Sequence, residues 1–178
     1  EEIKQEPATP IKDEAQGLDM LYSSGTTGRP KGIKWPLENT LPGARTMLVD
    51  LLNRLFGYGP ETRYLCPAPL YHAAPLRHAM VTIKMGGTAV IMDRFDAETS
   101  LRLIEQYKIT HSQWVPTMFV RLLKLPEATR ARYDLSSMEM AVHAAAPCPV
   151  KIKYEMLSWW GDIIHEYYAG TENNGFSA

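Results

Sequence analysis

The chain has 178 residues, which is the size of one domain and is enough to bury a hydrophobic core. Its 19 lysines and arginines nearly balance its 20 aspartates and glutamates, which argues against a nucleic-acid-binding domain, because such a domain shows a basic patch or stripe. Two cysteines are too few for a disulfide framework and no apolar run approaches the ~20 residues that span a bilayer, so we expect a cytoplasmic protein without a transmembrane segment.

The first third of the chain begins with a polar segment. Residues 1–17 contain two prolines and mixed charges, which predicts a linker or irregular arm. A short apolar run at residues 18–22 leads into a glycine-rich stretch, and residues 39–56 then have the apolar spacing of a helix. Four leucines are expected on one face of that helix: Leu48, Leu51, Leu52 and Leu55.

Strand-like and helix-like segments alternate through the rest of the chain. The predicted strands cover residues 63–68, 88–92, 109–115, 138–143 and 163–168, and the second of these is expected to be buried. The predicted helices cover residues 76–85, 97–107, 117–124 and 150–160, with Asp96 as the N-cap of the second. This alternation indicates an α/β fold with a largely parallel sheet flanked by helices.

The stretch Tyr22–Gly32, YSSGTTGRPKG, is the richest in chemistry. Its three glycines allow the backbone to approach a ligand closely, and its four hydroxyls can donate hydrogen bonds to phosphate oxygens. It is not a Walker A loop, because Gly25 and Gly28 stand too close together and Gly32 follows Lys31 where serine or threonine belongs. Its composition favours phosphate binding, and a mobile surface loop is the alternative.

Several polar or pocket-like segments begin where predicted strands end. In parallel sheets, ligands bind beyond the carboxyl ends of the strands. The first residues of these segments are Ser23, Pro69, Pro116, Ala144 and Ala169. We therefore expect a common site at this edge of the sheet.

Four motifs resemble those of the AMP-forming adenylate superfamily, which includes acyl-CoA synthetases, peptide-synthetase adenylation domains and firefly luciferase. They are YSSGTTGRPKG, PAPLYHAAP at residues 67–75, AAAP at residues 144–147 and YYAGTE at residues 167–172, and they span almost the whole chain in the family's order. The second is most similar to bacterial fatty-acid-CoA ligases. Two positions depart from the family's pattern, which has glycine in place of Ala144 and of Ala169.

The resemblance implies phosphate and metal binding by two of these motifs. The residues implied at the β- and γ-phosphates of ATP are Ser23, Ser24, Gly25, Thr26, Thr27, Gly28 and Lys31. Thr171 would bind a phosphate oxygen, and Glu172 would bind Mg²⁺, which prefers oxygen ligands. The alternatives are a solvated loop lysine at Lys31 and a plain helix start after Gly170.

The other two motifs are implied in adenine and acid binding. The residues implied in the adenine site and beside it are Ala145, Ala146, Pro147, Tyr168 and Gly170. Tyr168 would offer its ring for stacking, with a core tyrosine as the alternative. His72 would lie near the substrate carboxylate and acyl tunnel, with a histidine satisfied by backbone groups as the alternative. Residues 114–119 are either a wall of the acyl pocket or plain core.

The implied chemistry is the attack of a carboxylate on the α-phosphate of ATP. Both partners are anionic, so the site must neutralise charge and hold them in line. The residues implied in this step are Thr27, Lys31, His72, Thr171 and Glu172.

The sequence thus predicts an ATP- and Mg²⁺-dependent fatty-acid-CoA ligase that forms acyl-AMP from a fatty or other carboxylic acid and transfers the acyl group to coenzyme A. The alternatives are an adenylation domain that loads a carrier protein or activates an aryl acid, and a non-catalytic nucleotide-binding module. Members of the resembled family are several hundred residues longer. We therefore interpret residues 18–178 as a fragment of the N-terminal domain without the C-terminal lid domain, and expect the isolated chain to be inactive.

Overall fold

The computed structural model describes residues 7, 9–23, 28–37, 39–171 and 175–178. Contacts divide the chain into two compact units, with the boundary between Thr46 and Met47. The first unit contains an antiparallel hairpin of β1 (Leu21–Ser23) and β2 (Lys31–Ile33). The apolar run at residues 18–22 leads into the glycine-rich stretch as expected. Its last residues lie in β1, which belongs to this antiparallel hairpin and not to a parallel sheet.

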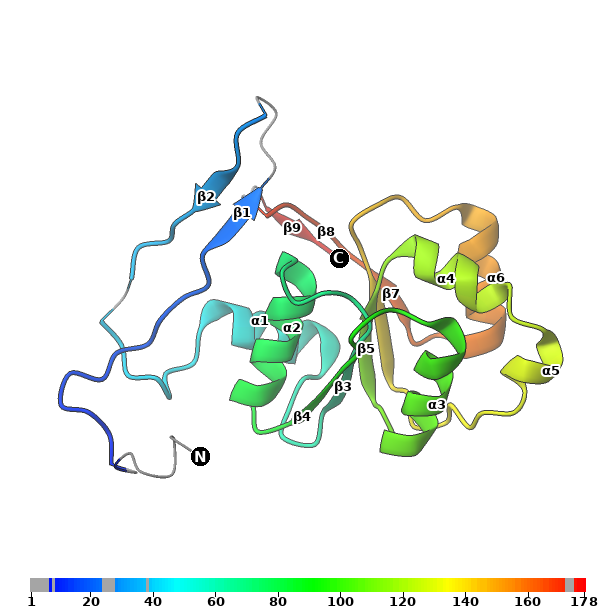
Figure 1. Ribbon diagram of the computed structural model, residues 1–178, viewed down its shortest axis with the longest axis horizontal. Coiled ribbons are helices and arrows are strands. Elements are labelled where there is room, and N and C mark those ends of the chain that lie inside the picture. The colour runs from blue at the N-terminus through cyan, green and yellow to red at the C-terminus, as the bar shows by residue number, and fades with distance from the viewer. Residues whose placement is uncertain (1–6, 8, 24–27, 38, 172–174) are drawn as a thin grey trace. The chain divides into compact units, whose positions relative to one another are not determined.

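The second unit is built on a parallel sheet (Figure 1). Within the described residues this sheet has five strands in the order β4-β3-β5-β6-β7, and every neighbouring pair is parallel. The strands are β3 (Arg63–Cys66), β4 (Thr88–Ile91), β5 (His111–Trp114), β6 (Met140–His143) and β7 (Ile164–Glu166). The predicted fold class is confirmed.

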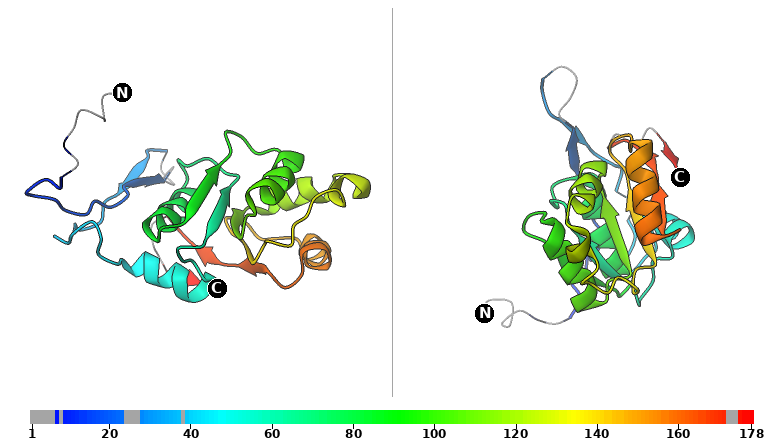
Figure 2. Two further views of the ribbon diagram at one scale, coloured as in Figure 1. Left: turned by 90° about the horizontal axis from the view of Figure 1, so that it is seen from below. Right: turned by 90° about the vertical axis from the view of Figure 1, so that its right-hand side faces the viewer.

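Helices cover both faces of this sheet (Figure 2). They are α1 (Met47–Phe56), α2 (Ala73–Lys84), α3 (Ala97–Tyr107), α4 (Pro116–Leu123), α5 (Glu127–Arg130) and α6 (Val150–Trp160). Because successive strand residues point to opposite faces, β3 contributes to two cores. Leu65 packs with residues of α3, α4 and α6, whereas Tyr64 and Cys66 pack with residues of α1 and α2.

Of the five predicted helices, α3 and α6 have their predicted ranges, α2 and α4 differ from theirs by one to three residues, and α1 begins much later than predicted. α6 has the predicted bounds, and α3 begins after Asp96, whose carboxylate accepts a hydrogen bond of 2.8 Å from the amide of Thr99. α1 begins eight residues later than predicted, after the helix-breaking pair of residues 42–43. Its buried residues are Val49, Leu52 and Phe56, whereas Leu55 is exposed, so the side of α1 that faces the core includes only part of the predicted leucine face.

Two strand predictions also need correction. β4 was expected to be buried, but it lies at the edge of the sheet and Ile91 is 44% exposed. The strand predicted at residues 163–168 ends at Glu166. The chain then forms β8 (Tyr168–Ala169), which pairs antiparallel with β9 (Phe176–Ser177). An apolar run cannot distinguish an edge strand from a central one, and the two-residue strands of this hairpin show no measurable periodicity.

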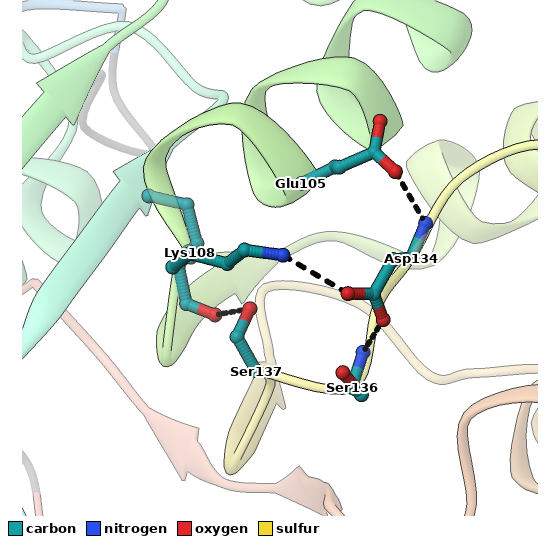
Figure 3. A network of polar contacts seen from close by, with 6 residues as sticks. Glu105, Lys108, Asp134, Ser136 and Ser137 are labelled. Atoms are coloured by element: carbon teal, nitrogen blue, oxygen red, sulfur yellow. Dashed lines mark hydrogen bonds and ion pairs between the residues drawn. The ribbon is translucent and has the colours of Figure 1, made fainter.

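Polar contacts fasten the loop before β6 to the end of α3 (Figure 3). Lys108 Nζ lies 2.9 Å from Asp134 Oδ2, and Glu105 Oε1 accepts a hydrogen bond of 3.0 Å from the amide of Asp134. Ser137 donates a hydrogen bond of 2.8 Å to the carbonyl oxygen of Ile109. These residues precede β5 and β6, so the network holds the amino ends of the strands and belongs to the scaffold.

Candidate active site

The carboxyl ends of the parallel strands mark the expected ligand position. β3 continues into α2 and β5 continues into α4, and these two helices pack on opposite faces of the sheet. β3 and β5 are neighbours. In open α/β sheets, ligands bind where neighbouring strands send the chain to opposite faces. Topology alone therefore points to the carboxyl ends of β3 and β5 and the strands beside them.

Backbone hydrogen bonds join the segments that follow β5, β6 and β7. The amide of Ala144 donates to the carbonyl of Trp114 at 3.3 Å, and the amide of Tyr167 donates to the carbonyl of His143 at 3.2 Å. Trp114 and His143 are register partners, as are His143 and Glu166. The carboxyl ends of these three strands therefore lie side by side, and the common site expected there remains a prediction.

A turn of small residues follows β6 and carries a left-handed residue. Ala144 is buried, whereas Ala145, Ala146 and Pro147 are exposed. Ala145 has a φ of 75°, a conformation that is uncommon for a residue with a side chain and tends to occur at functional sites. The backbone of this turn can therefore be approached closely by a flat ligand.

The two consecutive tyrosines after β7 have different environments. Tyr167 packs against Phe56 and stacks on Phe176 with ring centroids 5.1 Å apart, and burial raises its pKa to about 12. Tyr168 is 82% exposed, so the alternative of a core tyrosine is wrong. Tyr167 anchors the β8–β9 hairpin to the second unit, and Tyr168 presents its ring to solvent. Gly170 and the half-buried Thr171 follow β8.

His72 stands at the carboxyl end of β3, at the N-cap position of α2. Its side chain is exposed and does not cap the helix, and its ring centroid lies 4.5 Å from that of Tyr71. Within residues 114–119, Trp114 at the end of β5 and Phe119 in α4 are fully buried and belong to the core with Trp160. The plain-core interpretation therefore holds for these two aromatic residues.

Sequence reasoning missed a polar cluster beside the small-residue turn. Lys153 Nζ, from α6, lies 2.6 Å from His143 Nε2 and 3.4 Å from Glu166 Oε2. Burial, and then the charge of Lys153, lower the pKa of His143 to about 4. The spacing of α6 contained the signal, because Lys153 is three and seven residues before the buried Met156 and Trp160 and therefore shares their face.

Five of the predicted site residues lie outside the described part of the chain: Ser24, Gly25, Thr26, Thr27 and Glu172. In the hairpin of the first unit, Ser23 is the register partner of Lys31, so these two residues flank the glycine-rich segment. Lys31 is exposed, and Gly28 has a left-handed φ of 79°. The phosphate roles of these residues remain predictions.

Among the described residues, no group of three or more histidine, cysteine, aspartate or glutamate side chains is arranged to hold a metal ion. The predicted Mg²⁺ ligand, Glu172, is outside this set. No helix in the described ranges has both the length and the apolar character needed to cross a membrane.

An open parallel sheet with a small-residue turn and an exposed aromatic ring at its carboxyl edge has the arrangement in which α/β proteins bind ligands. The family model "AMP-binding enzyme" matches residues 1–178. The chain therefore belongs to the AMP-binding enzyme family, and the predicted resemblance is confirmed.

Relatives in this family are CoA ligases. The probable CoA ligase CCL5 of Humulus lupulus is 32% identical over 161 residues, which are 89% of this chain and 28% of the relative. The medium/long-chain-fatty-acid–CoA ligase FadD8 of Mycobacterium tuberculosis is 31% identical over 159 residues, which are 88% of this chain and 26% of the relative. The chain thus spans roughly a quarter of the length of these relatives. These matches support an AMP-forming ligase as the class of enzyme.

Solved structures of adenylate-forming enzymes share the fold. The amide bond synthetase McbA from Marinactinospora thermotolerans matches with a TM-score of 0.73 and 29% identity over 89% of this chain and 30% of that chain. ATP-bound MatB from Rhodopseudomonas palustris matches with a TM-score of 0.69 and 25% identity, again over 89% and 30%. The described fold is therefore that of the N-terminal domains of adenylate-forming enzymes.

Proposed function

We propose that this chain is the nucleotide- and acid-binding section of an AMP-forming acyl-CoA ligase. One observation carries the proposal: the two motifs implied in adenine binding follow the adjacent strands β6 and β7. The amide of Tyr167, the first residue of one motif, donates a hydrogen bond to the carbonyl of His143, which directly precedes the other motif. The family match over residues 1–178 and the CoA ligase relatives support the same function.

The residues at this edge suit ATP. The exposed ring of Tyr168 offers a stacking surface for adenine, and the turn of Ala145, Ala146 and Pro147 allows close approach of the base. For the first unit, the resemblance of its glycine-rich motif leads us to propose Ser23, Gly28 and Lys31, with the residues between them, as phosphate-binding residues. Mg²⁺ bound by Glu172 would neutralise phosphate charge, and Thr171 would donate to a phosphate oxygen.

The acid is proposed to be a fatty acid and the acceptor coenzyme A. The relative FadD8 is named for medium- and long-chain fatty acids, and His72 stands at the carboxyl end of β3 where the carboxylate would enter. A second candidate is an enzyme that passes the acyl group to an amine or a carrier protein, or that activates an aryl acid. It is favoured by the structural match to an amide bond synthetase. A cytoplasmic location also remains a prediction.

Thioester synthesis by the complete protein tests this proposal. Short, medium, long-chain and aryl acids would each be incubated with Mg-ATP and coenzyme A, and acyl-CoA measured by mass spectrometry. We expect acyl-CoA from fatty acids, and its loss in Thr27→Ala and Glu172→Gln. Glu155→Gln, at an exposed position of α6, is the matched control and should keep full activity. Acyl-AMP without acyl-CoA would favour the second candidate, and neither product would refute both.

A further inference from the structure

Lys153 is a largely covered lysine beside the adenine-site turn. Its side chain is 22% exposed and lies on the face of α6 that also carries the buried Met156 and Trp160. A lysine in such a place needs partners for its ammonium group. His143, at the end of β6, and Glu166, at the end of β7, provide them at 2.6 and 3.4 Å.

The directions of these hydrogen bonds follow from the charge states. The side chain of His143 is fully buried, and its pKa of about 4 keeps the imidazole neutral near pH 7. An ammonium group can only donate, so Nε2 of His143 accepts and the ring proton is on Nδ1. The carboxylate of Glu166 accepts from the same ammonium group. One lysine therefore joins α6 to the carboxyl ends of two strands.

The hydrogen bond between Lys153 and His143 joins the two ends of the segment that contains the turn. His143 directly precedes Ala144, and Lys153 lies in the first turn of α6, which begins after Pro149. Between them Ala145 has a φ of 75°. Alanine disfavours this conformation and glycine tolerates it, so the surrounding structure must hold the turn.

We propose that Lys153 is a positioning residue, which acts through His143 to hold the left-handed turn at Ala145 in the conformation that receives the adenine. The inference rests on the proposed function for the adenine role of the turn. The motifs assign no role to Lys153 or to His143. Lys153 itself does not contact the nucleotide in this scheme.

A set of variants of the complete enzyme separates this role from general packing. Lys153→Met removes the donor, and Lys151→Met is the matched control, because Lys151 is on the same helix with a side chain that is 86% exposed. Lys153→Met combined with Ala145→Gly tests the mechanism, because glycine adopts the left-handed conformation without support. The KM for ATP and kcat would be measured by carboxylate-dependent ATP–pyrophosphate exchange. Hydrogen exchange of the backbone amides of residues 144–146 and 148 would be measured without ligand, since Pro147 has no amide hydrogen.

We expect Lys153→Met to raise the KM for ATP about tenfold with little change in kcat. The loss of a hydrogen bond to a charged group has an effect of about this size. A substitution that weakens ground-state and transition-state binding equally raises KM and leaves kcat unchanged. Amide exchange in residues 144–148 should accelerate. Lys151→Met should change neither quantity, and the double variant should recover most of the KM. If Lys153→Met does not fold, Glu166→Gln replaces it, with a smaller rise in KM expected.

Two results would overturn the inference. One is an unchanged KM and unchanged amide exchange in Lys153→Met. The other is a rise in KM that Ala145→Gly does not reverse. If the unmodified enzyme shows no ATP-dependent exchange, the proposed function fails, while the amide-exchange comparison still tests whether Lys153 holds the turn.

Discussion

Acid should destabilise the second unit through His78, a buried histidine on α2. Its side chain is 3% exposed, and its Nδ1 lies 2.7 Å from the hydroxyl oxygen of Tyr58. The ring of Tyr64 stacks on it at a centroid distance of 5.9 Å. Burial, and then the nearby His111, lower the pKa of His78 from 6.5 to about 3. Between pH 3 and pH 6.5 the imidazole is therefore neutral in the folded chain and charged in the unfolded chain.

The sign and size of the effect follow from this difference. As the pH falls from 6.5 towards 3, the unfolded chain binds a proton that the folded chain does not, so the free energy of unfolding decreases. At pH 4 the loss relative to pH 7 is about 3 kcal/mol, since each pH unit in this window contributes about 1.4 kcal/mol. This is a large fraction of the ~5–15 kcal/mol by which domains are stable.

Urea unfolding at pH 7, 6, 5 and 4, followed by tryptophan fluorescence, measures this loss. The comparison is His78→Asn, whose amide does not titrate and can form a hydrogen bond with Tyr58. We expect the variant to be less stable at pH 7, because asparagine fills less of the site. Its acid-induced loss should nevertheless be about 3 kcal/mol smaller than that of the unmodified chain. Equal losses in the two proteins would refute the reasoning.

Three further substitutions, two of them paired with a control substitution, test the scaffold by the same urea assay. Asp96→Ala removes the N-cap of α3 and should cost about 1 kcal/mol; no change would show that the cap contributes nothing. Leu101→Ala, in the core at 0% exposure, should cost about 2–5 kcal/mol, whereas Ile83→Ala, at 66% exposure, should stay within about 0.5 kcal/mol. Equal costs would contradict the assigned core. Gly87→Ala would place a Cβ atom 2.5 Å from a backbone oxygen and should cost about 1–3 kcal/mol. Gly59→Ala meets nothing closer than 4.0 Å and should cost less, so the opposite order would refute the close approach at Gly87.

The sequence predicted the regular elements where local signals agreed. α3 has a capping aspartate at its start, and β4 and β6 are mainly apolar runs that alternate with helical segments. The start of α1 was missed because an apolar pattern extends through residues 42–43, where the backbone cannot remain helical. The two antiparallel hairpins were missed because strands of two or three residues carry no period. Whether β4 lies at an edge depends on its neighbours, which its own composition does not specify.

The motifs predicted the location of the candidate site better than its details. They placed the residues of the second unit at the carboxyl ends of the strands, where Tyr168 is exposed as a stacking residue requires. The left-handed Ala145 could not be predicted, because the family pattern suggests glycine one residue earlier, at the position of Ala144. The bond between Lys153 and His143 joins two elements ten residues apart and appears only once α6 packs against the sheet.

Carboxylate-dependent ATP–pyrophosphate exchange by the complete protein tests the central claim most directly. It detects reversible formation of acyl-AMP and needs no acceptor, so it separates the adenylation step from thioester formation. We expect exchange that requires both Mg²⁺ and a fatty acid. We expect Glu172→Gln to abolish it. Absence of exchange with every acid tested, in a protein that is folded and binds ATP, would contradict the assignment of this chain to a working ligase.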